Sequence, residues 1–304
     1  MKISLVGVSR AGKTCYISAM SQILKNCKLQ NGCKVILRAV DVAQQLELDN
    51  NYMEMVTSGK WPKGTDSTKS YNFRIQIQGN GSMLQLPSLT MDDYKGGVLT
   101  LIGPKADVER KQFIDSLKET ALITFLIDGD TVISALDELD KDVSHRGMEY
   151  AAKEKLASRN NISILDNILY SYLQNGNSIP PIMVVITKSD VFATEEELRN
   201  GMELVRDLLS SLFMPGSNVF AGITAVSLGT DLAKGEDDSI LGMLDISTNH
   251  NVHIPMLFAL YAYLDATYDT YPDPDLVDGL MALVRNEFNG RATFYDNGEE
   301  TLPI

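Results

Sequence analysis

Residues 7–14, GVSRAGKT, combine glycines, a lysine and a threonine at a spacing suited to holding phosphate groups. Gly7, Gly12, Lys13 and Thr14 complete the pattern G-x-x-x-x-G-K-[ST], between an apolar stretch and a helix-like stretch. Glycines let the backbone N–H groups curl around phosphates, lysine reaches the outer phosphates, and the threonine hydroxyl can coordinate Mg²⁺. A chance match in a glycine-bearing turn is the alternative. The residues expected around the phosphates are Gly7, Ser9, Arg10, Ala11, Gly12, Lys13, Thr14 and Cys15.

A second polar motif, TKSD at 187–190, follows directly on the apolar stretch IMVVIT. The Asp190 carboxylate can accept hydrogen bonds from N1–H and the 2-amino group of guanine, a donor pair that adenine lacks. The aliphatic stem of Lys188 can lie over the base plane. A solvated loop is the alternative for so short a motif, but ligands bind at the carboxyl ends of parallel strands. We therefore expect Thr187, Lys188 and Asp190 to bind guanine.

Both motifs need a frame of strands and helices to position them. Apolar stretches separated by helical patterns predict an α/β fold with a mainly parallel six-stranded sheet and helices on both faces. Segment 71–78 alternates in polarity, and GNG separates it from 82–91, so this pair predicts a hairpin that adds one antiparallel edge strand. The stretches expected to be buried strands are 2–7, 122–128, 182–187 and 219–227.

The rest of the chain predicts one main domain with additions. We expect this domain over 1–268, with a helical insertion at about 129–160 and a crossover helix at 162–176. A helical extension and tail would occupy 269–304. The longest apolar stretch, 254–264, is about half the ~20 residues that a membrane span needs, so it predicts a buried helix and no integral membrane segment.

Composition limits the classes of partner. The net charge of −13 and a pI near 4.7 argue against a broad nucleic-acid interface, which needs concentrated lysine and arginine. The three cysteines have no zinc-type spacing, and the N-terminus has no leader pattern, which together predict a reduced, cytoplasmic protein.

With these motifs in this order, residues 1–268 resemble the P-loop GTPases of the translation-factor-related (TRAFAC) clade, which share a Ras-like fold. The resemblance implies that DYKGG is the D-x-x-G box. Asp93 would hold Mg²⁺ through a water, and the Gly96 N–H would contact the γ-phosphate. The form of this box is similar to that of a group of bacterial GTPases that tend to occur in conflict or defence gene neighbourhoods.

The resemblance also implies two weaker motifs. The switch threonine, which completes the Mg²⁺ shell beside Thr14 and Asp93, best matches Thr65, with Thr68 as the competitor and an ordinary Ser/Thr-rich turn as a further reading. The last box is similar to AVSLG, which would place Ser227 and Leu228 beside the guanine O6, although it departs from the usual Ser-Ala-Lys.

The resemblance implies a switch that binds GTP or GDP with Mg²⁺, hydrolyses GTP slowly, and signals through loops at about 58–70 and 93–106. Hydrolysis would be slow because Gly97 stands where many relatives have a Gln or His that orients water. Arg10 is either a built-in catalytic cation or a solvent-facing loop residue. An effector, an activating protein or a second copy of the chain would then supply the missing group. The residues expected to act in hydrolysis are Lys13, Thr65, Gly96 and Arg10.

Two alternatives to this function stay open at this point. One is a non-hydrolysing interaction module, in which bound GTP only fixes the two loops for a partner. The other is an ATPase, or a kinase acting on a small acceptor, although no acceptor-site constellation accompanies the motifs.

Overall fold

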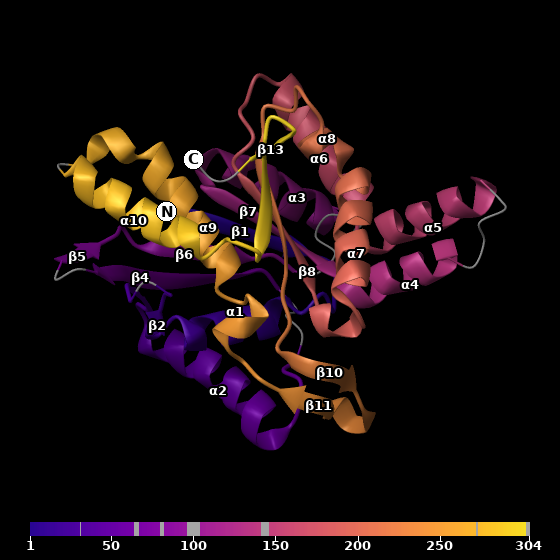
Figure 1. Cartoon of the computed structure of the whole chain (residues 1–304), viewed down its shortest axis with the longest axis horizontal. Helices are drawn as coiled ribbons and strands as arrows, with labels where there is room; N and C mark the ends of the chain where they lie inside the picture. The colour runs from indigo at the N-terminus through magenta and orange to yellow at the C-terminus, as the bar shows by residue number, and fades with distance from the viewer. Residues whose placement is uncertain are drawn as a thin grey trace.

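The computed structural model confirms an α/β fold, with five parallel strands in the middle of its main sheet in the order β9–β8–β7–β1–β6 (Figure 1). Because these strands are parallel, their carboxyl ends all lie at one edge of the sheet. Their bounds are β1 Lys2–Gly7, β6 Leu89–Asp93, β7 Leu122–Asp128, β8 Ile182–Thr187 and β9 Phe220–Ala225. The structure describes residues 1–30, 32–63, 67–79, 82–95, 104–140, 146–271 and 273–301.

Antiparallel strands extend this sheet on both sides. Among the described residues the main sheet has eleven strands, so the prediction of six strands with one antiparallel edge strand is wrong. The added strands are short or mix polar with apolar residues, so their sequences alone do not mark them as strands. Their bounds are β2 Cys27–Lys28, β3 Lys34–Ala39, β4 Lys69–Gly79, β5 Ser82–Gln85, β12 Ala292–Asp296 and β13 Glu299–Thr301.

The predicted strand at 82–91 is in fact two strands. The β5 part pairs antiparallel with β4, as the hairpin prediction required. The β6 part pairs with the other end of β4 and runs parallel beside β1. Pro87, which has no N–H to donate to a ladder, lies between the two parts.

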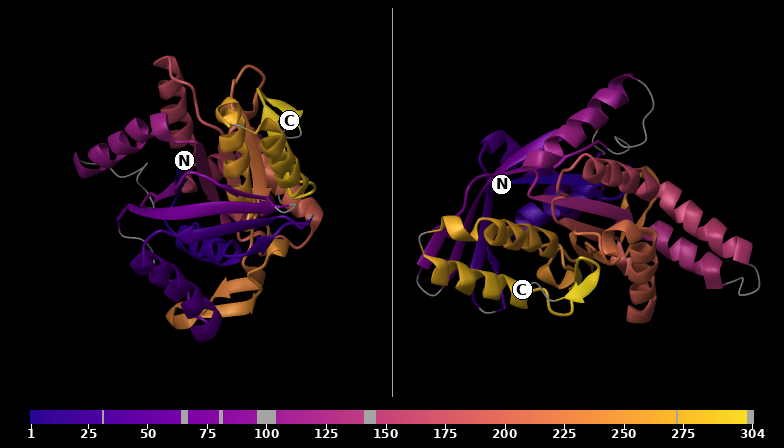
Figure 2. Two further views of the ribbon diagram at one scale, coloured as in Figure 1. Left: turned by 90° about the vertical axis from the view of Figure 1, so that its left-hand side faces the viewer. Right: turned by 90° about the horizontal axis from the view of Figure 1, so that it is seen from above.

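Helices cover both faces of the parallel strands (Figure 2). Helices α1, α9 and α10 pack on one face, and α3, α6 and α7 pack on the other. The bounds are α1 Lys13–Ile23, α2 Val42–Ser58, α3 Pro104–Ser116, α4 Gly129–Asp140, α5 Arg146–Arg159, α6 Ile162–Gln174, α7 Glu195–Leu208, α8 Ser210–Phe213, α9 Ile254–Ala266 and α10 Pro274–Asn286. Single-turn 3-10 helices are η1 Leu117–Glu119, η2 Ser189–Val191, η3 Glu236–Asp238, η4 Thr248–His250 and η5 Tyr268–Thr270.

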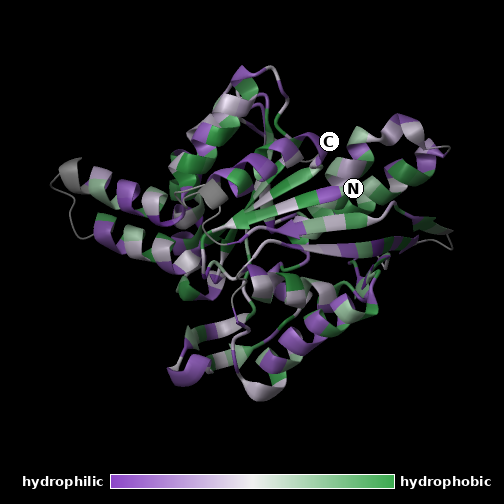
Figure 3. Cartoon of the chain, turned by 180° about the vertical axis from the view of Figure 1, so that it is seen from behind, coloured by the Kyte–Doolittle hydropathy of each residue, from purple (hydrophilic) through white to green (hydrophobic). Residues whose placement is uncertain are grey.

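Alternation along the strands divides the core into two layers. In β8, Met183 and Val185 face the layer that contains α1 and α9, whereas Val184 and Ile186 face the layer that contains α3 and α6. Strands β7 and β8 are therefore apolar on both faces, within a mostly hydrophobic middle of the sheet (Figure 3). Helix α9 lies almost wholly inside the first layer, as predicted for 254–264, and no helix among the described residues is long and apolar enough to cross a membrane.

The C-terminal segment joins the same sheet. Strand β12 pairs antiparallel with β9, and Phe294 of β12 is buried beneath α9 and α10. Its ring centroid lies 5.0 Å from those of Phe258 and Phe288. Residues after 286 therefore contribute to the core.

We expect Phe294→Ala to lower the free energy of unfolding by about 3–5 kcal/mol, because the substitution removes a buried ring and leaves a cavity. Urea unfolding followed by circular dichroism measures this change. Glu299→Ala, at an exposed position of β13, is the control and should shift stability by less than about 0.5 kcal/mol. Equal stability of the two variants would contradict the packing of β12.

Candidate functional site

The sequence motifs meet at the carboxyl edge of the parallel strands. The loop 7–14 follows β1, Asp93 ends β6, and TKSD follows β8. Registers of the ladder place Leu5 opposite Asp93 and Asp128 opposite Thr187. This is the edge at which open α/β sheets bind ligands.

The backbone of loop 7–14 needs glycine at defined points. A Cβ on Gly7 would lie 2.8 Å from the Leu126 carbonyl oxygen of β7, closer than a side chain can come. Arg10 and Gly12 have left-handed backbones, with φ of 72° and 81°. Gly12 is the N-cap of α1 and supplies no side-chain cap, and the first turn carries no acidic residue. No N-cap side chain therefore occupies the start of α1, the end of a helix at which phosphates bind.

Lys13 is buried at the start of α1. Its Nζ donates to the carbonyl oxygens of Gly7 and Val8, both at 2.9 Å. Burial lowers the pKa of Lys13, and the nearby Asp93 carboxylate partly opposes this. The ammonium is thus folded onto the backbone of its own loop.

Two adjacent aspartates end β6, and they face opposite sides of the sheet. Asp92 forms an ion pair with Lys2 at 3.0 Å and accepts a hydrogen bond from Ser70 at 2.6 Å. Asp93 is fully buried and lies close enough to Lys13 to affect its pKa. The structure therefore brings Asp93, and not Asp92, to the loop 7–14.

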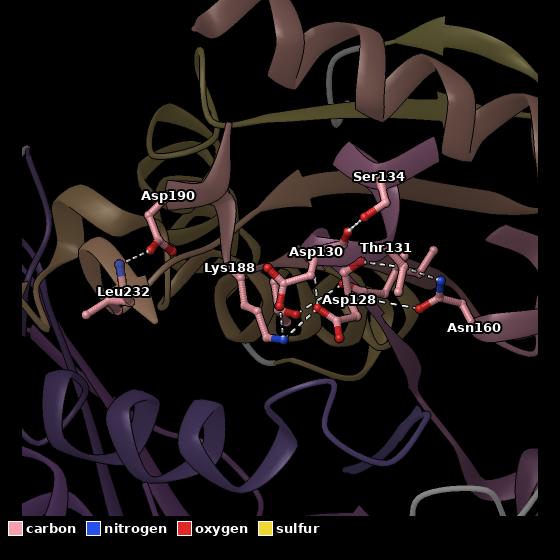
Figure 4. Close-up of polar contacts among 10 residues, drawn as sticks. Asp128, Asp130, Thr131, Ser134, Asn160, Lys188, Asp190 and Leu232 are labelled. Carbon is pink, nitrogen blue, oxygen red and sulfur yellow. Dashed lines mark hydrogen bonds and ion pairs between the residues drawn. The ribbon is translucent and has the colours of Figure 1, made fainter. Parts of the chain in front are cut away.

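The lysine of TKSD is held by two acidic side chains (Figure 4). Lys188 Nζ lies 2.8 Å from Asp128 Oδ1 and 2.6 Å from Asp130 Oδ2. Burial lowers the pKa of Lys188, but the two carboxylates outweigh burial and raise it above its ordinary value. Thr187 is buried and donates through Oγ1 to the Ile127 carbonyl, which ties the ends of β7 and β8 together.

Asp190 points away from Lys188, toward the hairpin formed by β10 (Gly229–Lys234) and β11 (Ile240–Leu244) (Figure 4). Its Oδ2 accepts the Leu232 N–H at 2.7 Å. Its Oδ1 is buried and has no hydrogen-bond partner among the described residues. Burial raises the pKa of Asp190, and the Leu232 N–H partly opposes the rise.

The loop after β9 is occupied by internal contacts. The Ser227 N–H donates to the His250 carbonyl at 3.3 Å, and Ser227 Oγ lies 2.7 Å from His250 Nδ1. His250 Nε2 lies 3.1 Å from Asp245 Oδ2. Leu228 packs against the core layer that holds α9. In this arrangement the Ser227 N–H is engaged by the His250 carbonyl.

Three predicted positions, Thr65, Gly96 and Gly97, lie outside the described residues. Thr68, the competitor of Thr65, accepts the Lys95 N–H through Oγ1 at 3.4 Å. This contact joins the two loops expected at 58–70 and 93–106. Ser9 and Arg10 are exposed, whereas Ala11 is buried.

The oxygen atoms expected to bind Mg²⁺ belong to Thr14, in the first turn of α1, and to Asp93. No group of three or more His, Cys, Asp or Glu residues suited to a metal occurs in the part of the chain that the structure describes. A hydroxyl and a carboxylate suit Mg²⁺, which binds through few protein ligands together with substrate phosphates and waters.

Sequence reasoning missed Asp128, Asp130 and the hairpin contact of Leu232. Asp128 could have been found, because it ends the apolar strand LITFLID at the ligand-binding edge. Leu232 could not, because it acts through its backbone N–H. A comparison with protein-family models found no match to this chain, and no curated protein is significantly similar to it.

Cys15 provides a check on packing beside the site. Burial raises the pKa of the Cys15 thiol to about 12, so the thiol stays protonated at neutral pH. We expect native Cys15 to react with iodoacetamide at pH 8 at least about 100-fold more slowly than a free cysteine. Peptide mass mapping measures the labelling, and the protein unfolded in guanidinium, labelled at all three cysteines, is the control. Rapid labelling of native Cys15, which is partly exposed, would contradict the raised pKa of its thiol.

Proposed function

We propose that the chain is a GTP-binding switch of Ras-like fold that hydrolyses GTP slowly. One observation carries the proposal. Lys13 follows the carboxyl end of β1 and Asp190 follows the carboxyl end of β8, and only β7 lies between these two strands. Two strand spacings amount to about 10 Å, which the ribose and phosphates of a nucleotide can bridge. This spacing supports the proposal that one nucleotide binds with its phosphates near Lys13 and its base near Asp190.

The phosphate end of the site would be formed by α1 and the loop before it. The uncapped first turn of α1 offers N–H donors and a positive dipole end to the phosphates. Lys13 would exchange its two carbonyl acceptors for phosphate oxygens, which are stronger acceptors because they are charged.

The base end would be formed by Asp190. Its buried Oδ1, an acceptor without a hydrogen-bond partner among the described residues, suits the N–H donors of guanine. Adenine presents no such donor pair at this edge, so it would leave the carboxylate unpaired. This chemistry favours GTP over ATP.

Thr14 and Asp93 would hold Mg²⁺, Asp93 through a water. The ion, when bound, supplies positive charge against the phosphate oxygens as negative charge develops on them. The reaction is transfer of the γ-phosphoryl group to water, which yields GDP and phosphate. Lys13 and the α1 N-terminus would stabilise the same charge from the protein side.

The proposed rate is slow because few side chains are placed to help the attacking water. Gly97 supplies no side chain, and Arg10 is exposed. Positioning and charge stabilisation provide nearly all catalysis of phosphoryl transfer. An activating protein, or a second copy of the chain, would supply the missing groups.

We expect wild-type protein to bind GTP and GDP in preference to ATP, and Asp190→Asn to weaken GTP binding about 30- to 150-fold. Losing hydrogen bonds to a charged acceptor corresponds to about 2–3 kcal/mol. The same substitution should improve binding of xanthosine triphosphate, which offers an acceptor where guanine has its amino group. Isothermal titration calorimetry measures both affinities.

Lys13→Ala is the matched control for this experiment. It should weaken the binding of every nucleotide to a similar extent, without altering the far-ultraviolet circular dichroism of the ligand-free protein. Equal affinity of the wild type for ATP and GTP would contradict a guanine site at Asp190.

We expect hydrolysis by purified protein to be well below the ~1–10³ s⁻¹ range common among enzymes. Phosphate release is measured over a range of protein concentrations, with Arg10→Ala in parallel. Fast turnover independent of concentration would contradict the need for a partner, and a large loss in Arg10→Ala would assign the catalytic cation to this chain. No hydrolysis in a single-turnover assay would favour a non-hydrolysing module.

A further inference from the structure

The hairpin β10–β11 forms a two-stranded sheet of its own, separate from the main sheet. It follows the Ser227 loop directly, and the Asp245 N–H donates to the Leu228 carbonyl at its base. The hairpin extends from there to the C-terminal end of α2 (Figure 1). It therefore reaches from the proposed base site to the start of the 58–70 loop.

A bulge in this hairpin directs one N–H at Asp190. Thr230 pairs with Met243 and Ala233 pairs with Leu241, so Asp231 and Leu232 together face only Gly242. Asp231 has a φ of 52°, and the Leu232 N–H donates to Asp190 Oδ2. Residue 242 must be glycine, since a Cβ there would lie 2.3 Å from the Asp231 carbonyl oxygen.

The same contact covers the carboxylate that guanine would need. Asp190 Oδ2 is bonded to the Leu232 N–H, and Oδ1 is buried without a hydrogen-bond partner among the described residues. A base can form hydrogen bonds with both oxygen atoms only after the hairpin moves. An unsatisfied buried acceptor is unfavourable, so guanine, which offers two donors, can replace the single N–H of Leu232.

The far end of the hairpin holds the loop after α2. The Trp61 N–H donates to the Asp238 carbonyl at 2.9 Å, and the Ile240 N–H donates to the Gly59 carbonyl at 2.7 Å. Lys60 and Ser239 form an isolated antiparallel bridge between these bonds. Residues 59–61 are thus joined to the hairpin by backbone pairing.

Charges near the tip also act across to the loop 7–14. The pKa of Asp238 is lowered mainly by Lys234, with smaller effects from Arg10 and Lys60. Arg10 belongs to the loop 7–14, so the tip of the hairpin lies within electrostatic range of that loop.

We propose that the hairpin 229–244 is a lid on the guanine site, which guanine displaces from Asp190, and that this displacement releases residues 59–61. The inference rests on the proposed function, since it assumes that Asp190 binds guanine. The base of the nucleotide, and not only its γ-phosphate, then controls the 58–70 loop.

Trp61 is the only tryptophan of the chain, so its fluorescence reports on this loop alone. We expect saturating GDP to shift or quench Trp61 emission, whereas inorganic pyrophosphate, which lacks a base, should leave it unchanged. Calorimetry in the same buffer measures the binding of both ligands. An identical Trp61 response to pyrophosphate and GDP would overturn the proposal.

A shortened hairpin separates the lid from the rest of the site. Replacing 231–242 by Asn-Gly joins the ladder pair Thr230 and Met243 through a two-residue turn. This variant should bind GDP at least about tenfold more tightly than wild type, without a GDP-dependent change in Trp61 emission. The control Leu241→Ala, at an exposed position of β11, should respond as the wild type does.

The outcomes distinguish the lid from the proposed function. If calorimetry detects no GDP binding to wild type, both are overturned. If wild type binds GDP with unchanged Trp61 emission, or if the shortened hairpin weakens GDP binding, only the lid is overturned.

Discussion

Five strands buried on both faces must lie in the middle of the sheet, and this constraint organises the rest of the molecule. Strands with apolar residues on both faces cannot be the outermost strands of the sheet without exposing apolar surface to water. Their parallel pairing requires helical crossovers and brings their carboxyl ends to a single edge. The phosphate loop, Asp93, Asp128 and TKSD lie at that edge because each follows one of these strands.

Charged groups at this edge are satisfied by contacts that a ligand can replace. Lys13 donates to carbonyl groups of its own loop, Lys188 pairs with two carboxylates, and Asp190 accepts one backbone N–H. When no ligand is bound, each contact reduces the desolvation penalty of a partly buried charge. The Asp190 contact differs from the other two, because it comes from a separate hairpin that also pairs with residues 59–61. A ligand that replaced it would therefore affect a segment distant in sequence.

The antiparallel strands at both sides of the sheet complete the two core layers. On one side, β3 and β4 cover α2 and the first layer with residues such as Val35 and Phe73. On the other side, β12 places Phe294 beside the rings of Phe258 in α9 and of Phe288, which follows α10. These additions extend the sheet without changing the edge at which the parallel strands end.

Local patterns in the sequence were sufficient for the parts of the protein whose residues are neighbours along the chain. Uninterrupted apolar stretches predicted β7, β8 and α9 closely, because complete burial leaves no polar position in the stretch. The loop 7–14 was predicted from its glycines, since the backbone geometry there excludes most other residues.

Only the tertiary structure decided what depends on pairing between distant segments. The strands β2, β3, β12 and β13 are too short and mixed to be recognised alone, and the sheet was therefore predicted with too few strands. The D-x-x-G spacing had already selected Asp93, but the pairing of Asp92 with Lys2 on the other side of the sheet was decided by the tertiary structure, because one step along a strand reverses the face. The contact of Leu232 with Asp190 is made by a backbone N–H that a bulge frees, and every residue type except proline carries the same group, so residue identity could not reveal it.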